Sequence, residues 1–131
     1  MREENKDRGK QNREWGKETE ELAYEYFLKN GYTIRERNWR CNKIEIDLIL
    51  QLDNTIIFVE VKARKEGTQD PVDAVNRKKQ LMMIRGADIY LRMLDKPHEF
   101  RFDIVTFKGD RKEFEFRHYP DAFMPSVNGG R

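Results

Sequence analysis

The chain has 131 residues, and 37% of them are hydrophobic, which is enough for the core of one domain but not of two. Lys and Arg number 26 against 24 Asp and Glu, so a net charge of +2 excludes a strongly polybasic or polyacidic protein, and any basic surface must be local. The apolar runs are too short for a transmembrane helix. A single cysteine, Cys41, excludes an internal disulfide framework, so we expect a cytoplasmic protein in which this thiol is inert.

The N-terminal part is predicted to be an arm followed by a helix. Residues 1–15 alternate in charge without apolar periodicity, which predicts a flexible, solvated arm. Residues 16–30 then show the apolar spacing of an amphipathic helix, which Asn30-Gly31 ends.

Three strands, a second helix and two further strands are predicted next. Alternating and β-branched segments place the strands at 32–37, 44–51, 55–62, 100–107 and 113–119. Asp70 as N-cap and Pro71 as first helical residue open a helix that runs to about Leu94, with a bend or frayed turn at Gly86. We therefore expect one α/β domain over 16–119, a mixed sheet flanked by helices in the order αβββαββ, and a loose tail over 120–131.

The second and third strands are predicted to form a hairpin around Asp53 and Asn54, which tolerate the backbone of a two-residue turn. This register places the apolar residues of both strands on one face and the charged residues on the other. The apolar face pairs Ile44 with Ala63, Ile46 with Val61 and Leu48 with Val59, and the other face pairs Glu45 with Lys62, Asp47 with Glu60 and Ile49 with Phe58.

Two carboxylates opposite each other dominate the second face. Their Cβ atoms would lie about 4.5–5.5 Å apart, where like charges destabilise a sheet. A hard divalent cation such as Mg²⁺ would reverse that effect, because it prefers carboxylate oxygens and keeps open positions for substrate phosphates. The alternative is structural: Glu45 pairs with Lys62, while Asp47 and Glu60 face solvent on an uncovered sheet.

The segment Asp47, then Glu60-Val61-Lys62, resembles the PD-(D/E)xK signature of restriction-endonuclease-like nucleases, which include archaeal Holliday junction resolvases. Taken together, the motifs over about 16–107 look like the YraN family, an uncharacterised bacterial branch of that superfamily. These motifs are Gly16-x-x-x-Glu20-x-x-Ala23, Gly31-Tyr32-Thr33-Ile34, Asn38-x-Arg40, Glu45-Ile46-Asp47-Leu48-Ile49, Phe58-Val59-Glu60-Val61-Lys62-Ala63-Arg64, Val75-x-x-Lys78-x-x-Leu81, Tyr90-Leu91 and Arg101-Phe102-Asp103-Ile104-Val105.

The resemblance implies a restriction-endonuclease-like fold and a site for Mg²⁺ or Mn²⁺. It implies that Asp47 and Glu60 bind the metal, that Lys62 is the catalytic lysine, and that Glu20 helps to hold the metal or its water. Without the resemblance, Glu20 is predicted to be an acid of the first helical turn, favoured by the helix dipole. Glu45 either orients Lys62 from behind or only neutralises it.

Several other charged and aromatic residues have both a functional and a structural interpretation. Lys78 either directs its amine toward the sheet or lies along the surface. Asp103 is predicted to pair with Arg101, and neither His98 nor His118 has companions at metal-ligand spacing. Trp15 and Trp39 suit core packing better than base stacking. The candidate phosphate contacts are Arg64, Lys65, Arg77, Lys78, Lys79 and Arg85.

These residues predict a metal-dependent DNA endonuclease, with branched or damaged DNA as a candidate substrate. A second interpretation is a non-catalytic nucleic-acid-binding or adaptor protein that retains the nuclease fold, and a third is a structural domain with surface acids. Resolvases of similar fold are dimers, so a homodimer is expected by analogy.

Overall fold

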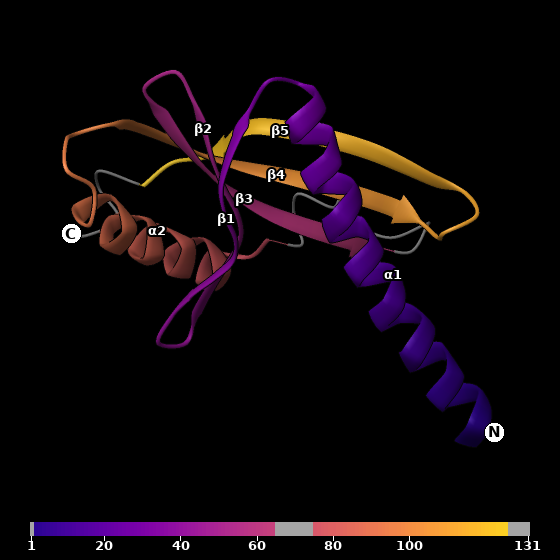
Figure 1. Ribbon diagram of the computed structural model, residues 1–131. Helices are drawn as coiled ribbons and strands as arrows, with labels where there is room; N and C mark the ends of the chain where they lie inside the picture. The colour runs from indigo at the N-terminus through magenta and orange to yellow at the C-terminus, as the bar shows by residue number, and fades with distance from the viewer. Residues whose placement is uncertain (1, 65–74, 126–131) are drawn as a thin grey trace.

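The computed structural model describes residues 2–64 and 75–125, which form seven elements in the predicted order αβββαββ (Figure 1). The elements are α1 (Arg2–Lys29), β1 (Thr33–Cys41), β2 (Ile44–Leu52), β3 (Thr55–Arg64), α2 (Arg77–Arg92), β4 (Glu99–Gly109) and β5 (Phe114–Phe123). The five strands form one sheet in the order β1-β2-β3-β4-β5, in which β3 and β4 are parallel and the other neighbours are antiparallel. The predicted mixed α/β sheet is confirmed.

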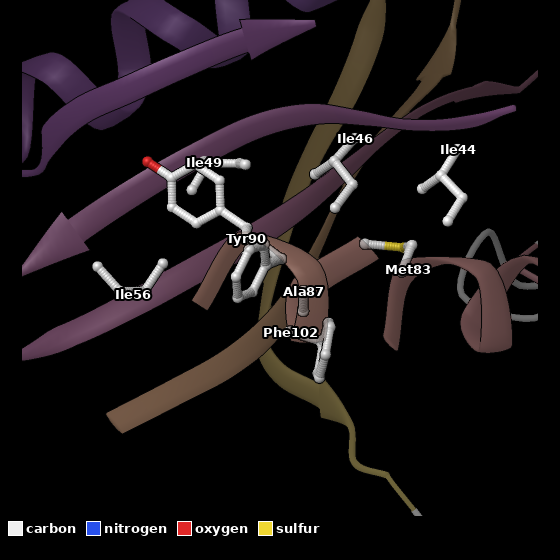
Figure 2. Packing of buried hydrophobic residues seen from close by; sticks show 9 residues of the cluster. Ile44, Ile46, Ile49, Ile56, Met83, Ala87, Tyr90 and Phe102 are labelled. Atoms are coloured by element: carbon white, nitrogen blue, oxygen red, sulfur yellow. The ribbon is translucent and has the colours of Figure 1, made fainter. Parts of the chain in front are cut away.

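The two helices pack on separate apolar clusters. Ala23 and Phe27 of α1 are fully buried against residues of β2, β3 and β4. Met83 and Ala87 of α2 are buried in the other cluster, which Figure 2 shows from close by. Neither described helix is long and apolar enough to span a lipid bilayer.

Helix α1 begins at Arg2 instead of near Gly16, so the segment predicted as an arm is helical from its second residue. This segment is rich in Arg, Glu, Lys and Gln, which have high helix propensity even where no apolar face is present. Figure 1 shows its N-terminal part extending away from the sheet. Trp15 marks the start of the packed part, because its ring lies 6.3 Å from that of Phe107 and 5.2 Å from that of Phe114.

Helix α2 begins six residues later than the predicted start at Pro71. Its N-cap is Asn76, whose side-chain oxygen accepts a 2.9 Å hydrogen bond from the backbone N–H of Lys79. The predicted cap, Asp70, and Pro71 lie outside the described residues. The C-terminal tail prediction is also too early, because β5 continues to Phe123.

The β2–β3 hairpin has the predicted turn and register, but the pairing stops earlier than predicted. The ladder runs from Leu52↔Thr55 to Leu48↔Val59 and includes the predicted pair Ile49↔Phe58. The pairs expected beyond Leu48 are absent from it. The backbone N–H of Val61 instead donates to Oδ2 of Asp47 at 2.8 Å.

Strand β2 also changes faces at this point, which corrects the predicted single apolar face. Ile44 and Ile46 pack with Met83 in the α2 cluster (Figure 2), whereas Leu48 packs in the α1 cluster. The neighbouring strand is irregular at the same level, where Asn38 has a left-handed φ of 50°. This shared irregularity breaks the period of two and leaves Asp47 beside the opening between β2 and β3.

Gly86 marks the close approach of α2 to β2, and the helix continues through it to Arg92 without the predicted frayed turn. A Cβ at this position would lie 2.8 Å from Cγ2 of Ile44 and 3.0 Å from Cδ1 of Ile46. Gly86→Ala should therefore lower the free energy of unfolding by about 1–3 kcal/mol through overpacking, despite the better helix propensity of alanine. Urea unfolding measures this. Arg85→Ala, at an exposed neighbouring position, should stay within about 0.5 kcal/mol of the wild type, and a more stable Gly86→Ala variant would contradict the contact.

Candidate metal and phosphate site

The candidate site lies where the β2–β3 ladder ends, at the carboxylates of Asp47 and Glu60. Glu60 retains 4% of its exposure, and its side chain is hydrogen-bonded to that of Asp47. Because Oδ2 of Asp47 also accepts the N–H of Val61, the backbone of β3 fixes the direction of this carboxylate. The two acids therefore meet, as predicted, although through the broken end of the ladder and not as a regular cross-strand pair.

The protonation of Glu60 reflects this burial. Burial, together with the hydrogen bond to Asp47 and the negative charge of Asp47, raises the pKa of Glu60 from 4.5 to about 9. The positive charges of Lys79 and Lys62 act in the opposite direction. Glu60 therefore holds its proton well above the ordinary range of a carboxyl group, because two full negative charges in this position would lack sufficient compensation.

Lys79 is the residue of α2 that reaches the acids. Its Nζ lies 3.3 Å from Oε2 of Glu60 and donates a 3.5 Å hydrogen bond to the carbonyl of Glu45. The alternative in which Lys78 directs its amine toward the sheet is wrong, because its side chain is exposed. Lys79 lies four residues before the buried Met83, so it continues the face of α2 that packs on the sheet.

Helix α1 brings Glu20 toward the same carboxylates. Burial raises the pKa of Glu20, and the negative charges of Asp47 and Glu45 raise it further. The interpretation of Glu20 as a first-turn acid is wrong, because α1 starts at Arg2 and Glu20 lies well inside the helix. Its proximity to the acids agrees with the role that the resemblance implies.

Glu45 and Lys62 do not form the predicted cross-strand pair. Oε1 of Glu45 lies 3.6 Å from Nη2 of Arg40 on β1, opposite Glu45 in the β1–β2 ladder. Lys62 is half-buried on β3, and its charge acts on Glu60, two residues before it. Lys62 is therefore free of the predicted partner and remains close to the acid pair.

Apart from Lys79, the candidate phosphate contacts that the structure describes are all exposed. Arg64 ends β3 and Arg77 and Lys78 begin α2, and all three side chains are exposed. Arg85 is exposed two turns further along α2. Lys65 lies outside the described residues.

A buried polar network connects β4, β5 and α1, and the sequence revealed only part of it. Asp103 accepts hydrogen bonds from Nε and Nη2 of Arg101 at 2.9 and 3.1 Å, so the predicted pair is confirmed. Nε2 of His118 lies 2.7 Å from Oδ2 of Asp103, and its Nδ1 lies 3.1 Å from the hydroxyl of Tyr26. His118 was missed because its partners are distant in sequence. This network fixes the helix that carries Glu20.

The remaining candidates have structural positions. Trp39 packs on the α2 cluster with its ring 5.5 Å from that of Tyr90, which confirms the packing interpretation. Trp15 likewise packs between α1 and the sheet. His98 contacts the carbonyl of Lys96 through Nδ1. Both tryptophans are half-buried against these clusters.

The acid pair has the donors that a hard divalent cation requires. Asp47 and Glu60 supply carboxylate oxygens, and a cation would compensate the negative charge that this buried position disfavours. Over residues 9–64 and 75–125, no three His, Cys, Asp or Glu side chains form a ready metal-binding group. The pair thus fits a cation that takes its other ligands from water and substrate, with Glu20 beside it.

Fold and site together define a small mixed α/β protein with a buried acid pair at a break in its sheet. The chain matches Uncharacterised protein family UPF0102 over residues 19–107, and it belongs to this family. It is 42% identical to a UPF0102 protein of Phocaeicola vulgatus over 115 residues, 87% of this chain and 95% of the relative. A UPF0102 protein of Alkaliphilus oremlandii is 37% identical over 116 residues, 86% of this chain and 99% of the relative.

The raised pKa of Glu60 predicts how stability depends on pH. Between pH 4.5 and about 9 the unfolded chain loses the Glu60 proton while the folded chain keeps it, so stability falls as pH rises through this range. Glu60→Gln carries no such proton. Its stability relative to the wild type should therefore increase by several kcal/mol from pH 5 to pH 9.

Urea unfolding of both proteins at pH 5, 7 and 9 without divalent cations measures this difference. Glu25→Gln, an exposed acid of α1, is the matched control and should follow the wild type at every pH. A constant offset between Glu60→Gln and the wild type would show that Glu60 ionises normally.

Proposed function

We propose that this protein is a metal-dependent endonuclease that hydrolyses phosphodiester bonds in DNA. The observation that carries the proposal is the buried, hydrogen-bonded pair Asp47 and Glu60, with Lys62 and Lys79 acting on it. The resemblance of Asp47, Glu60 and Lys62 to the PD-(D/E)xK signature supports the same conclusion. A cytoplasmic setting, in which DNA is accessible, agrees with this function.

The residues of the site divide the work of hydrolysis. Asp47 and Glu60 would hold Mg²⁺ or Mn²⁺, which when bound polarises the scissile phosphate and increases the acidity of a water molecule. Lys62 stabilises the negative charge that builds on the phosphate oxygens during attack. Glu20 orients the attacking water through a hydrogen bond to its carboxylate.

The exposed basic residues supply the contacts that position DNA. Arg64, Arg77 and Lys78 follow or precede the elements that carry the site, so they bind phosphates near the scissile bond. Such contacts carry no sequence information. We therefore propose recognition of DNA shape, with branched or nicked DNA as the substrate class.

The test is a cleavage assay on fluorescently labelled four-way junction, nicked, linear and single-stranded DNA, with an RNA duplex of the same sequence. We expect cleavage of branched or nicked DNA in Mg²⁺ or Mn²⁺, and none in EDTA. Lys62→Met should remove the activity while leaving the circular dichroism spectrum unchanged. Cleavage that persists in Lys62→Met would come from a contaminating nuclease and contradict the proposal.

A second candidate function is DNA binding without hydrolysis, which the exposed Arg77, Lys78 and Arg85 of α2 favour. It predicts salt-dependent binding in EDTA, measured by fluorescence anisotropy, and no cleavage of any substrate in Mg²⁺. The double charge reversal Arg77→Glu and Lys78→Glu should then abolish binding. A homodimer is also proposed, and sedimentation equilibrium measures it directly.

A further inference from the structure

The Lys79 ammonium lies on a carboxylate that the proposed metal would need. Its Nζ is 3.3 Å from Oε2 of Glu60, and Glu60 is almost completely buried. A buried carboxylate has few positions from which a cation can approach it. Lys79 therefore takes up one of the accessible sides of Glu60 from the direction of α2.

The structure of α2 fixes this ammonium in place. The Asn76 cap holds the backbone of Lys79 in the first helical turn, and the carbonyl of Glu45 accepts a second contact from Nζ. Gly86 allows α2 to approach β2 closely enough for the lysine to reach Glu60. The side chain of Lys79 is 30% exposed, so its ammonium can be hydrated by solvent when it moves away from Glu60.

Lys62 does not have the same relation to the acid pair. It follows Glu60 on the same strand, and its positive charge lowers the pKa of Glu60 less than that of Lys79 does. The two lysines thus approach from different elements, and only Lys79 is in ion-pair contact with a carboxylate of the site among the described side chains.

We propose that Lys79 is a resident cation that occupies Glu60 while the site holds no divalent metal, and that the metal must displace this ammonium in order to bind. The inference rests on the proposed metal-dependent function and adds a competition to it. Lys79 is a positioning residue in this scheme, and its release sets how tightly the site holds metal.

The experiment is calorimetric titration of Mn²⁺, without DNA, into the wild type, Lys79→Met, Lys79→Arg and Lys78→Met at one pH and 0.15 M salt. Methionine keeps an apolar stem of similar length without the charge. Lys79→Met should bind Mn²⁺ at least about tenfold more tightly than the wild type. Lys79→Arg should keep the wild-type affinity, and Lys78→Met is the matched control, because its side chain is exposed to solvent and the titration contains no DNA.

Tighter binding by Lys79→Met alone supports the inference, as does binding by this variant when the wild type shows none. Equal or weaker binding by Lys79→Met, or the same gain in Lys78→Met, overturns the inference and leaves the proposed metal site intact. Failure of all four proteins to bind millimolar Mn²⁺, with circular dichroism showing them folded, overturns both the inference and the metal-dependent function.

Discussion

Replacing Asp47 with asparagine should abolish Mn²⁺ binding and lower the rate of phosphodiester cleavage by at least about a hundredfold. The variant removes one of the two carboxylates that the cation would bind. The fold should persist, because the side-chain oxygen of asparagine can still accept the hydrogen bond from the N–H of Val61. Loss of the negative charge beside Glu60 also removes a repulsion from the buried pair.

Calorimetry with Mn²⁺ and single-turnover cleavage measure the two effects, and urea unfolding checks the fold. Asp53→Asn is the matched control, because Asp53 is an exposed acid of the same hairpin whose left-handed φ of 54° asparagine tolerates. The control should bind and cleave like the wild type. An unchanged cleavage rate in Asp47→Asn would refute the role of the acid pair.

Asp103→Ala should cause the largest loss of stability, about 3–5 kcal/mol in the free energy of unfolding. The carboxylate is completely buried and accepts hydrogen bonds from Arg101, His118 and the backbone N–H of Asp121. Removing it leaves the guanidinium of Arg101 without its charged partner. A loss of this size is a large part of the stability of an ordinary domain.

Urea unfolding measures the loss, and Asp103→Asn provides a milder variant if Asp103→Ala fails to fold. The double variant Asp103→Ala with Arg101→Met should recover part of the stability, because it removes the uncompensated charge. No recovery would show that the cost comes from the cavity and not from the broken ion pair.

The same network predicts stability against acid. Burial raises the pKa of Asp103, but hydrogen bonds from His118, Arg101 and Asp121 outweigh it, so the pKa lies below the ordinary value of 3.8. A lowered pKa contributes stability that is present above pH 3.8 and is lost as the pH falls through the lower, folded value. Asp103 is therefore expected to keep β4 and β5 together under mildly acidic conditions.

Much of the fold was predictable because its signals are local. Strand alternation and the Asp53-Asn54 turn placed the hairpin in the correct register near its turn. The side of the sheet on which Ile44 and Ile46 lie was not predictable, because it depends on the irregular backbone at Asn38 of the neighbouring strand β1. The first 14 residues of α1 were not predicted to be helical, because they lack apolar periodicity, although their residue types have high helix propensity.

The positions of the acids in the candidate site were predicted better than those of the lysines and arginines around them. Asp47 and Glu60 follow from the hairpin register, and Glu20 followed only from the resemblance. Both Lys78 and Lys79 were predicted to bind phosphates, and an amine directed toward the sheet was an open alternative for Lys78 only. The helix was predicted to start at Pro71, and without the Asn76 cap no pattern fixed which lysine faces the sheet. Arg40 was overlooked as the partner of Glu45 because it lies on β1, beyond the predicted end of that strand at Arg37.

The arrangement of the sheet has a consequence for the order in which the chain folds. The two acids come from one hairpin and are 13 residues apart, whereas β3 pairs in parallel with β4, whose register joins Thr55 to Glu99 across the whole of α2. Local pairing is fast, and closing a long loop is slow. We therefore expect Asp47 and Glu60 to come together before Lys79 packs against them. The repulsion between the two carboxylates then destabilises the hairpin early in folding.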